Sequence, residues 1–315
     1  LGNLGLAYYS LGQYQKAIEY HQQQLAIAKE IGDSSGEAKS LNNLGLAYRS
    51  LGQYQKAIKY FQQSLAIAKT ISNRQVEAKS LGNLGLAYYS LGQYQKAIEY
   101  HQQSLAIAKE IGDRQWEASS LGNLGSAYYS LGQYQKAIEY HQQSLAIAKA
   151  IGDRQGEASS LGNLGSAYYS LGQYQKAIEY DQQSLAIKRE IGDQQGEANS
   201  LNNLGLDHSS PGQYQEAIKY FQQSLAIAKA IGDRQGEAKS LGNLGSAYYS
   251  LGQYQKAIEY HQQSLAIAKA IGDRQWEAGI LGNLGNAYYS LGQYQKAIEY
   301  HQQSLAIAKA IGDRQ

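Results

Sequence analysis

The sequence predicts an all-α fold: an α-solenoid of eight stacked antiparallel helix pairs that winds into a right-handed superhelix. A 40-residue unit repeats along all 315 residues without insertion or deletion, and self-similarity at such a period is typical of repeat architectures. Apolar residues within the unit recur at helical spacing, and the alternating pattern of a β-strand is absent. Because one helix pair cannot bury its own apolar faces, near-identical pairs are expected to stack with the same rotation each time.

The repeat predicts a single array over residues 1–315. Its units are 1–40, 41–80, 81–120, 121–160, 161–200, 201–240, 241–280 and the incomplete 281–315. The stretch from Leu91 to Lys109 recurs letter for letter from Leu131, Leu251 and Leu291. This identity indicates recent duplication, so the differences between units carry the information.

Each unit contains two helices. The first is expected to begin after an aspartate such as Asp33, whose side chain can cap free backbone N–H groups, and to end near Leu51, before a turn at Gly52. The second begins near Gln53 and ends before a glycine equivalent to Gly112, where a left-handed C-cap is expected. A glycine recurs in the middle of the first helix, where it costs up to about 1 kcal/mol. We therefore expect a neighbouring helix to approach closely there.

The unit resembles the tetratricopeptide repeat, whose pattern maps onto Leu41, Leu44, Gly45, Tyr48, Ala57 and Phe61. Leu41 replaces the usual tryptophan, His101 and its equivalents replace phenylalanine in most units, and Lys69 replaces the terminating proline, so the second helix continues to Ile71. The long unit is similar to the repeats of Pins-type spindle-orientation adaptors, of kinesin light chain and of bacterial, especially cyanobacterial, arrays. The resemblance implies an adaptor that holds an extended peptide or tail of a partner protein in a concave groove lined by the first helices.

Composition argues against several other functions. The net charge of +2 lacks the basic footprint of a nucleic-acid binder, and the apolar runs are too short for a membrane span. The chain contains no cysteine, which excludes disulfides and thiolate metal sites. With no targeting signal at Leu1, we expect a cytoplasmic protein.

No motif in the sequence predicts catalysis, a metal or a cofactor. Serines are frequent, but no histidine and carboxylate recur beside one as in a catalytic triad. Lys16 with Glu19, and Lys96 with Glu99, are interpreted as weak exposed ion pairs. Five histidines share one repeat position and are expected to pack on the apolar stripe, about 10 Å apart and too distant to share an ion: His21, His101, His141, His261 and His301.

The exposed face of the first helix is the candidate binding surface. Trp116, Ser119, Asn123, Ser126 and Tyr129 follow a near-heptad spacing that keeps them on one side, and this face varies between units far more than the second helix does. A binding surface predicts such variation, although relaxed constraint on any exposed face would produce it too. The candidate aromatic contacts are Trp116, Trp276, Tyr129 and Tyr169, with the two tryptophans as anchors.

One position on this face never changes: Asn3, Asn43, Asn83, Asn123, Asn163, Asn203, Asn243 and Asn283. A carboxamide donates and accepts hydrogen bonds, so a ladder of asparagines can pair with the backbone of an extended peptide without demanding a sequence. The alternatives are that each asparagine bonds the adjacent helix within the array, or that invariance reflects recent duplication.

The leading hypothesis is a non-enzymatic adaptor that binds extended peptide segments. The alternatives are a structural spacer or self-assembling rod, and a regulatory arm of an enzyme or signalling protein encoded outside this sequence. We also expect head-to-tail self-association, because neither end shows a polar capping helix.

A hinge is predicted between the fifth and sixth units, where departures from the repeat pattern gather: Asp181, Lys188, Asp207, His208 and Pro211. An unpaired buried charge would cost several kcal/mol. Asp181 or Asp207 is therefore expected to pair with Lys188 or His208, although tolerated mutational damage would also explain the cluster.

Overall fold

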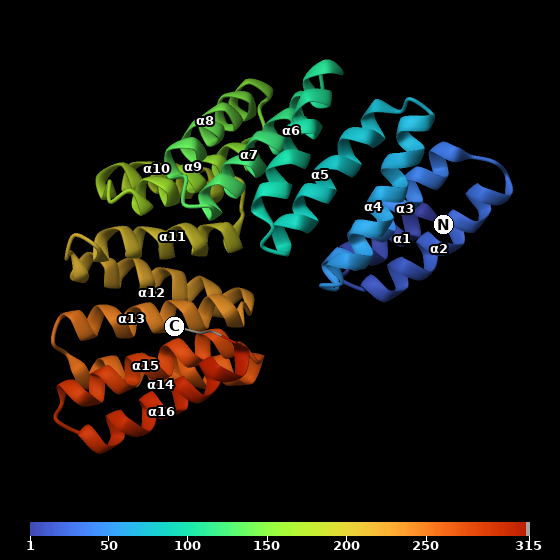
Figure 1. The fold of residues 1–315 in the computed structure, drawn as a ribbon. Helices are drawn as coiled ribbons and strands as arrows, with labels where there is room; N and C mark the ends of the chain where they lie inside the picture. The colour runs from blue at the N-terminus through green and yellow to red at the C-terminus, as the bar shows by residue number, and fades with distance from the viewer. Residues whose placement is uncertain (313–315) are drawn as a thin grey trace. The chain divides into compact units, whose positions relative to one another are not determined.

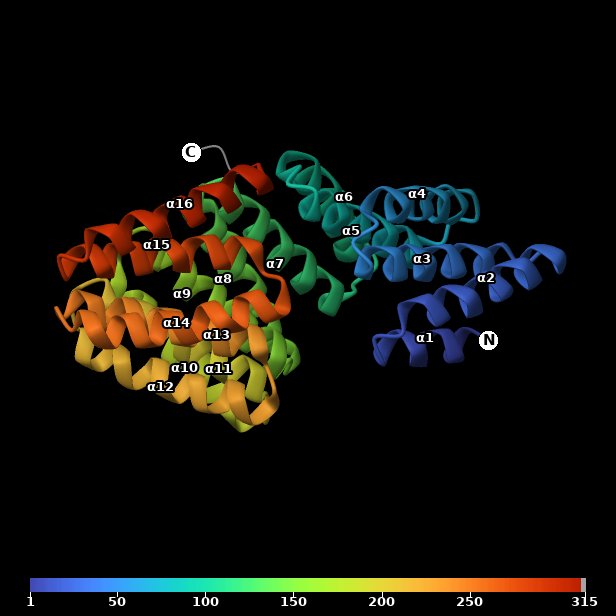
Figure 2. The same ribbon diagram turned by 90° about the horizontal axis from the view of Figure 1, so that it is seen from below.

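A computed structural model describes residues 1–312, which form sixteen α-helices and no β-strand (Figure 1). The helices are α1 Gly2–Ser10, α2 Tyr14–Glu30, α3 Ser34–Ser50, α4 Tyr54–Thr70, α5 Arg74–Ser90, α6 Tyr94–Glu110, α7 Arg114–Ser130, α8 Tyr134–Ile151, α9 Arg154–Ser170, α10 Tyr174–Glu190, α11 Gln194–Ser209, α12 Tyr214–Ile231, α13 Arg234–Ser250, α14 Tyr254–Ile271, α15 Arg274–Ser290 and α16 Tyr294–Ile311. Successive helices pack side by side within the array, as α3 and α4 do in Figures 1 and 2. The predicted all-α solenoid of helix pairs is confirmed. None of the described helices is long and apolar enough to cross a membrane.

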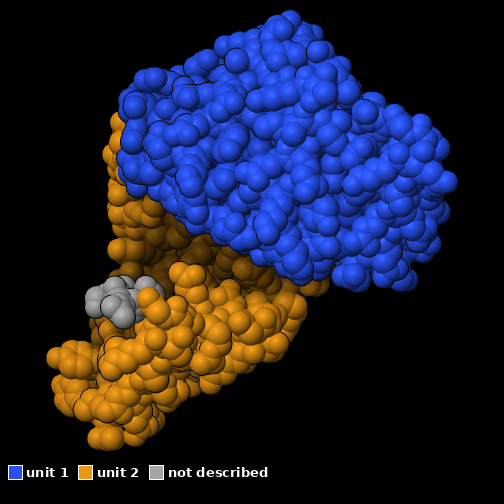
Figure 3. Space-filling model, turned by 45° about the vertical axis from the view of Figure 1, so that its right-hand side comes forward, with its two compact units in different colours: residues 1–163 blue, residues 164–315 orange. Residues whose placement is uncertain are grey.

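The chain divides into two compact units, Leu1–Asn163 and Leu164–Gln315 (Figure 3). The boundary lies inside α9, in the fifth repeat. Each of the two compact units is therefore a stack of similar helix pairs with its own interior.

The helix ends follow the predicted signals. The Asp33 carboxylate accepts a hydrogen bond from the backbone N–H of Gly36 at 2.9 Å and caps α3. Gly52 has a φ of 72°, a left-handed conformation that glycine adopts without a steric cost. Ser72 is the exception: it has a φ of 54° at a turn where the other repeats use glycine.

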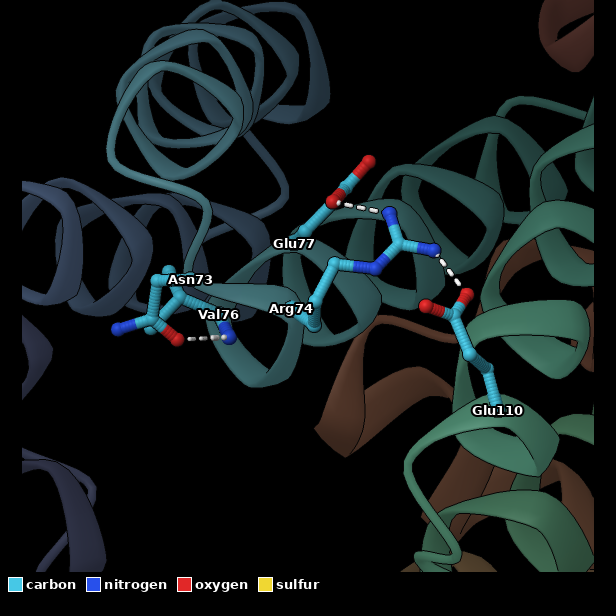
Figure 4. Close-up of polar contacts among 5 residues, drawn as sticks. All are labelled: Asn73, Arg74, Val76, Glu77 and Glu110. Atoms are coloured by element: carbon cyan, nitrogen blue, oxygen red, sulfur yellow. Dashed lines mark hydrogen bonds and ion pairs between the residues drawn. The ribbon is translucent and has the colours of Figure 1, made fainter.

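Polar contacts at the start of α5 connect it to the end of α6 (Figure 4). Asn73 caps α5 by accepting from the Val76 N–H at 3.1 Å. The Arg74 guanidinium contacts Glu77 at 2.7 Å within α5 and also bonds Glu110, the last residue of α6. Since Arg74 and Glu110 are both exposed, this ion pair contributes at most about 1 kcal/mol.

The glycines in the middle of the first helices lie against one side chain of the second helix, which is an aromatic ring in every repeat but the fifth. A Cβ added to Gly45 would lie 2.4 Å from the Phe61 ring, and one added to Gly125 would lie 2.5 Å from the His141 ring. The predicted close approach of the two helices is confirmed. Apolar side chains from the next pair complete the core, as Leu84 does beside Phe61.

Lysines at the start of the second helices lie over tyrosine rings. Tyr8 stacks on Tyr20 with ring centroids 5.2 Å apart, and the Lys16 Nζ lies 5.2 Å from the Tyr8 centroid. Lys96 has the same place over Tyr88. The predicted pairs of Lys16 with Glu19 and of Lys96 with Glu99 are wrong: no such ion pair is found among the described residues, because these ammonium groups extend toward the aromatic faces.

The polar departures in the fifth and sixth repeats pair differently from the prediction. The carboxyl groups of Asp181 and Asp207 lie close together, and the Asn203 side chain also lies near Asp181. Lys188 instead donates to the Ser200 hydroxyl at 3.0 Å. The fourth group, His208, contacts the Gln213 side chain at 2.6 Å. The expected pairing of an aspartate with Lys188 or His208 is therefore wrong, because the two carboxyl groups face each other across the α10–α11 interface.

Candidate functional site

The first helices of neighbouring repeats form the more closely spaced row. In residues 1–163, α3 contacts α5 directly and α5 contacts α7, whereas no such contact joins α2 to α4 or α4 to α6. Closer spacing is expected of the inner row in a curved stack of helix pairs. This arrangement supports the choice of the first-helix face as the candidate binding surface.

The invariant asparagines occupy this face in different environments. Asn83 Nδ2 donates to Asn42 Oδ1 of the preceding first helix at 3.0 Å, and Asn243 donates to Asn202 at 2.9 Å. A third, Asn203, lies near the buried Asp181. The remaining five are Asn3 and Asn163, which are exposed, and Asn43, Asn123 and Asn283, which are half-buried. Two of the eight asparagines thus bond a neighbouring first helix, in agreement with the alternative of bonds within the array.

The two tryptophans are half-buried between repeats. Trp116 Nε1 donates to the Ser104 hydroxyl of α6 at 2.8 Å, and Trp276 Nε1 donates to Ser264 at 3.0 Å. The Trp116 ring also lies against Gly82 of α5. The indoles therefore join neighbouring repeats, and only part of each ring faces solvent.

The two tyrosines of the candidate surface are also half-buried. Tyr129 lies 5.3 Å from Tyr134 between ring centroids, and Tyr169 lies 5.5 Å from Tyr174. The Tyr169 hydroxyl accepts a hydrogen bond from Ser210, on the next first helix, at 2.9 Å. These rings and hydroxyl groups help to fix one helix pair against the next.

A cavity of about 270 Å³ opens on the candidate surface between α7, α8 and α9. The predicted face of α7 lines one side through Ser119, Asn123 and Ser126, and Asn163 of α9 lies on the other side. Two asparagines of the invariant ladder thus border one hollow. The structure brings Asn123 and Asn163 together at this place, all of it within residues 1–163.

The cavity depends on residues that the sequence analysis did not single out. Gly122, Ser144 and Gly156 line it from three different helices. The available signal was a correspondence over 160 residues: Trp116 recurs only as Trp276, Phe61 only as Phe221 and Asn42 only as Asn202. This longer period marks the repeat position that holds a tryptophan at Trp116 and Trp276 but a glycine at Gly156.

The histidines serve packing. His21, His101, His141 and His261 are each 1% exposed and lie against a glycine of the first helix, which confirms the predicted packing role for these four. Burial lowers the pKa of His101, His141 and His261 to about 4. His301 is exposed. The described residues contain no group of three metal-ligating side chains.

Comparison with protein families identifies the repeat. A model described as "Tetratricopeptide repeat" matches residues 1–70, 76–150, 156–230 and 236–310. No curated protein sequence matches the chain.

Solved structures share the fold. Putative kinesin light chain repeats from Podosopora anserina are 29% identical, with a TM-score of 0.51, and the match covers 61% of this chain and 95% of that one. The quorum sensor NprR from B. thuringiensis, in its apo form, is 17% identical with a TM-score of 0.72, over 97% of this chain and 87% of that chain. A Rap protein complexed with competence and sporulation factor is 17% identical with a TM-score of 0.67, over 98% and 88%.

Proposed function

Because the chain belongs to the tetratricopeptide repeat family, we propose that it is a protein-interaction module that binds an extended peptide segment of a partner along its first helices. The observation that carries the proposal is the cavity between α7, α8 and α9, which Asn123 and Asn163 border on opposite sides. The Rap structure in complex with competence and sporulation factor supports interaction as a function of this fold.

The chemistry of the surface suits a peptide backbone. A carboxamide can donate through its N–H₂ group and accept through its oxygen, so it matches both halves of a peptide unit. Asn123 and Asn163 lie on successive first helices, and extended peptides present successive backbone groups along their length. Backbone pairing would supply affinity without a sequence requirement, and the variable neighbours of the asparagines would supply specificity.

The test compares amides on the two faces of the array. Peptides that bind the wild-type chain are selected from a display library of random extended segments, and their Kd is measured for each variant. Asn123→Ala combined with Asn163→Ala should weaken binding at least tenfold. The control is Gln103→Ala combined with Gln143→Ala on the second helices, where each amide bonds only its own helix, at Glu99 and Glu139.

Equal affinity of both double variants, or the absence of any selected peptide, would overturn the proposal in favour of a spacer. Circular dichroism shows whether each variant keeps the helical content of the wild type. Head-to-tail self-association remains a prediction, and sedimentation velocity over a range of concentrations tests it in the same preparation.

A further inference from the structure

The indole of Trp116 occupies a site that two other helices of the chain form. The ring lies against Gly82 of α5, where an added Cβ would come within 2.8 Å of ring atom Cζ2. Its Nε1 donates to the Ser104 hydroxyl of α6 at 2.8 Å. Gly82 of α5 and the Ser104 hydroxyl of α6 therefore form the walls of this site, and α7, the third helix, supplies the side chain that occupies it.

One repeat later the same walls surround the cavity. Gly122 and Ser144 stand where Gly82 and Ser104 stand in the preceding repeat, but Gly156 replaces the tryptophan. A Cβ added to Gly122 would meet only the Ser144 Oγ, at 3.5 Å. The cavity volume of about 270 Å³ lies just below the roughly 300 to 1,000 Å³ of sites for drug-sized ligands. It suits a single large side chain.

Ser144 can accept a further hydrogen bond. Its hydroxyl donates to the Ala118 carbonyl at 2.9 Å and accepts from the Ser160 hydroxyl at 3.1 Å. A hydroxyl oxygen has two lone pairs, so one acceptor position remains. Ser144 is 6% exposed where Ser104 is fully buried, so an N–H group entering the cavity can reach this oxygen.

The lining favours an uncharged ligand. Asp153 is the one charged residue in the cavity wall, and its carboxylate already accepts hydrogen bonds from the Gly156 N–H at 2.9 Å and from Gln115 Nε2 at 2.8 Å. The remaining walls are glycine, alanine, serine and asparagine. An aromatic ring with one N–H donor fits these walls better than an ammonium or a carboxylate.

The equivalent place is filled in some repeats and open in others. Trp276 occupies it beside Gly242, and the Lys188 side chain lies within 2.8 Å of where a Gly196 Cβ would be. At the hollow beside Gly36 the serine is replaced by Gln24. The cavity at Gly156 thus combines the glycine surface, the serine acceptor and an open third position, as does the hollow lined by Gly282 and Ser304 in the last repeat.

We propose that this cavity receives the indole of a tryptophan in the bound partner segment, with the indole N–H donating to Ser144. The inference rests on the proposed function and names the side chain that anchors the peptide. Asn123 and Asn163, on either side of the cavity, would then hold the backbone next to the anchored tryptophan. Large aromatic side chains in desolvated pockets are the usual anchors of interfaces.

The test uses indole itself as the probe, with binding measured by ligand-observed NMR. Benzofuran, which has an oxygen in place of the N–H, should bind roughly three- to tenfold more weakly because the hydrogen bond to Ser144 is lost. Gly156→Trp should abolish Ser144-dependent indole binding, because the new side chain fills the cavity as Trp116 fills the preceding one. Trp116→Gly should create an additional site with the same preference for indole over benzofuran.

Both variants introduce a residue that the chain already carries at this repeat position, and thermal unfolding confirms that each remains folded. Indole binding that is unchanged in Gly156→Trp, or no gain of a site in Trp116→Gly, would overturn the inference. Selected peptides whose binding depends on Asn123 and Asn163 but is unaffected by Gly156→Trp would leave the proposed function standing and remove only the tryptophan anchor.

Discussion

The carboxyl group of Asp207 on α11 lies close enough to that of Asp181 on α10, inside the second compact unit, to perturb its ionisation. Both side chains are at most 2% exposed. Burial raises the pKa of Asp207 to about 7, and burial together with the neighbouring Asp207 raises that of Asp181. The pair therefore keeps a proton at a pH where exposed aspartates are ionised.

The pair of aspartates predicts that the second compact unit loses stability as the pH rises. The pKa of Asp207 in the folded state exceeds its unfolded value near 4. The stability that this group contributes is therefore complete below about pH 4 and is lost as the pH rises through about 7. Asp181→Phe combined with Asp207→Ala restores residue types used elsewhere in the array. The gain in melting temperature of this variant over the wild type should be larger at pH 8 than at pH 5. An equal gain at both values would contradict the retention of this proton.

The buried histidines predict the opposite dependence. The pKa of His101 is lowered by burial to about 4, so stability is complete above about 6.5 and falls as the pH drops toward 4, by up to about 1.4 kcal/mol per pH unit. His101→Phe should therefore raise the urea midpoint more at pH 5 than at pH 7.5. The substitution should also raise the urea midpoint at pH 7.5, because both ring nitrogens of His101 are buried without a partner. The exposed His301 provides the control, and His301→Phe should change neither midpoint.

The sequence predicted the helices well because their ends are set locally. An aspartate such as Asp33 and a glycine such as Gly52 act within a few residues of the helix that they limit. The Trp116 site could not be predicted in the same way, since burial of the indole depends on Gly82 and Ser104, which lie on two other helices. The proximity of Asp181 to Asp207 could not be predicted for a similar reason. Opposite charge suggested that Lys188 would pair with an aspartate, but the packing of α10 on α11 decides which groups meet.

Ser72 predicts a stabilising substitution at a single turn. Its φ of 54° costs a serine about 1 kcal/mol relative to glycine. Ser72→Gly should raise the free energy of unfolding by about that amount. The reverse change at an equivalent turn, Gly112→Ser, should lower it similarly, because Gly112 has a φ of 69° and no atom within 4 Å of an added Cβ. Urea unfolding of the two variants measures both effects, and changes of the same sign would refute the conformational explanation.

Two helical glycines predict opposite effects of one substitution. Gly45→Ala would place a Cβ 2.4 Å from the Phe61 ring, and the forced shift should destabilise the chain by about 1 to 3 kcal/mol. Gly279→Ala in α15 meets nothing within 4 Å and should stabilise it by about 0.5 to 1 kcal/mol through helix propensity. The difference between the urea midpoints of the two variants separates the effect of the close helix contact at Gly45 from the effect of helix propensity. Stabilisation by both changes would show that the helices can separate at Gly45 without cost.

The junction of the fifth and sixth repeats is predicted to open more readily than the rest of the array. Pro211 has no N–H group to donate where Leu51 bonds the Ala47 carbonyl at the end of α3, and the buried Nε2 of His208 has no partner. Adjoining repeats can support a poor one, because stability in such arrays is approximately additive between neighbours. Hydrogen exchange should therefore be fastest across residues 181–211 in the wild type.

The combined substitution Asp207→Ala, His208→Tyr and Pro211→Leu separates strain from compensation. If these residues strain the junction, exchange across residues 181–211 in the restored variant should slow to the rate of the equivalent segment 101–131, because a lower opening free energy is the cause of fast exchange. Exchange should stay unchanged in segment 101–131 itself, which serves as the internal reference. Uniform protection along the wild-type array, or fast exchange that persists after restoration, would exclude a hinge built from these residues.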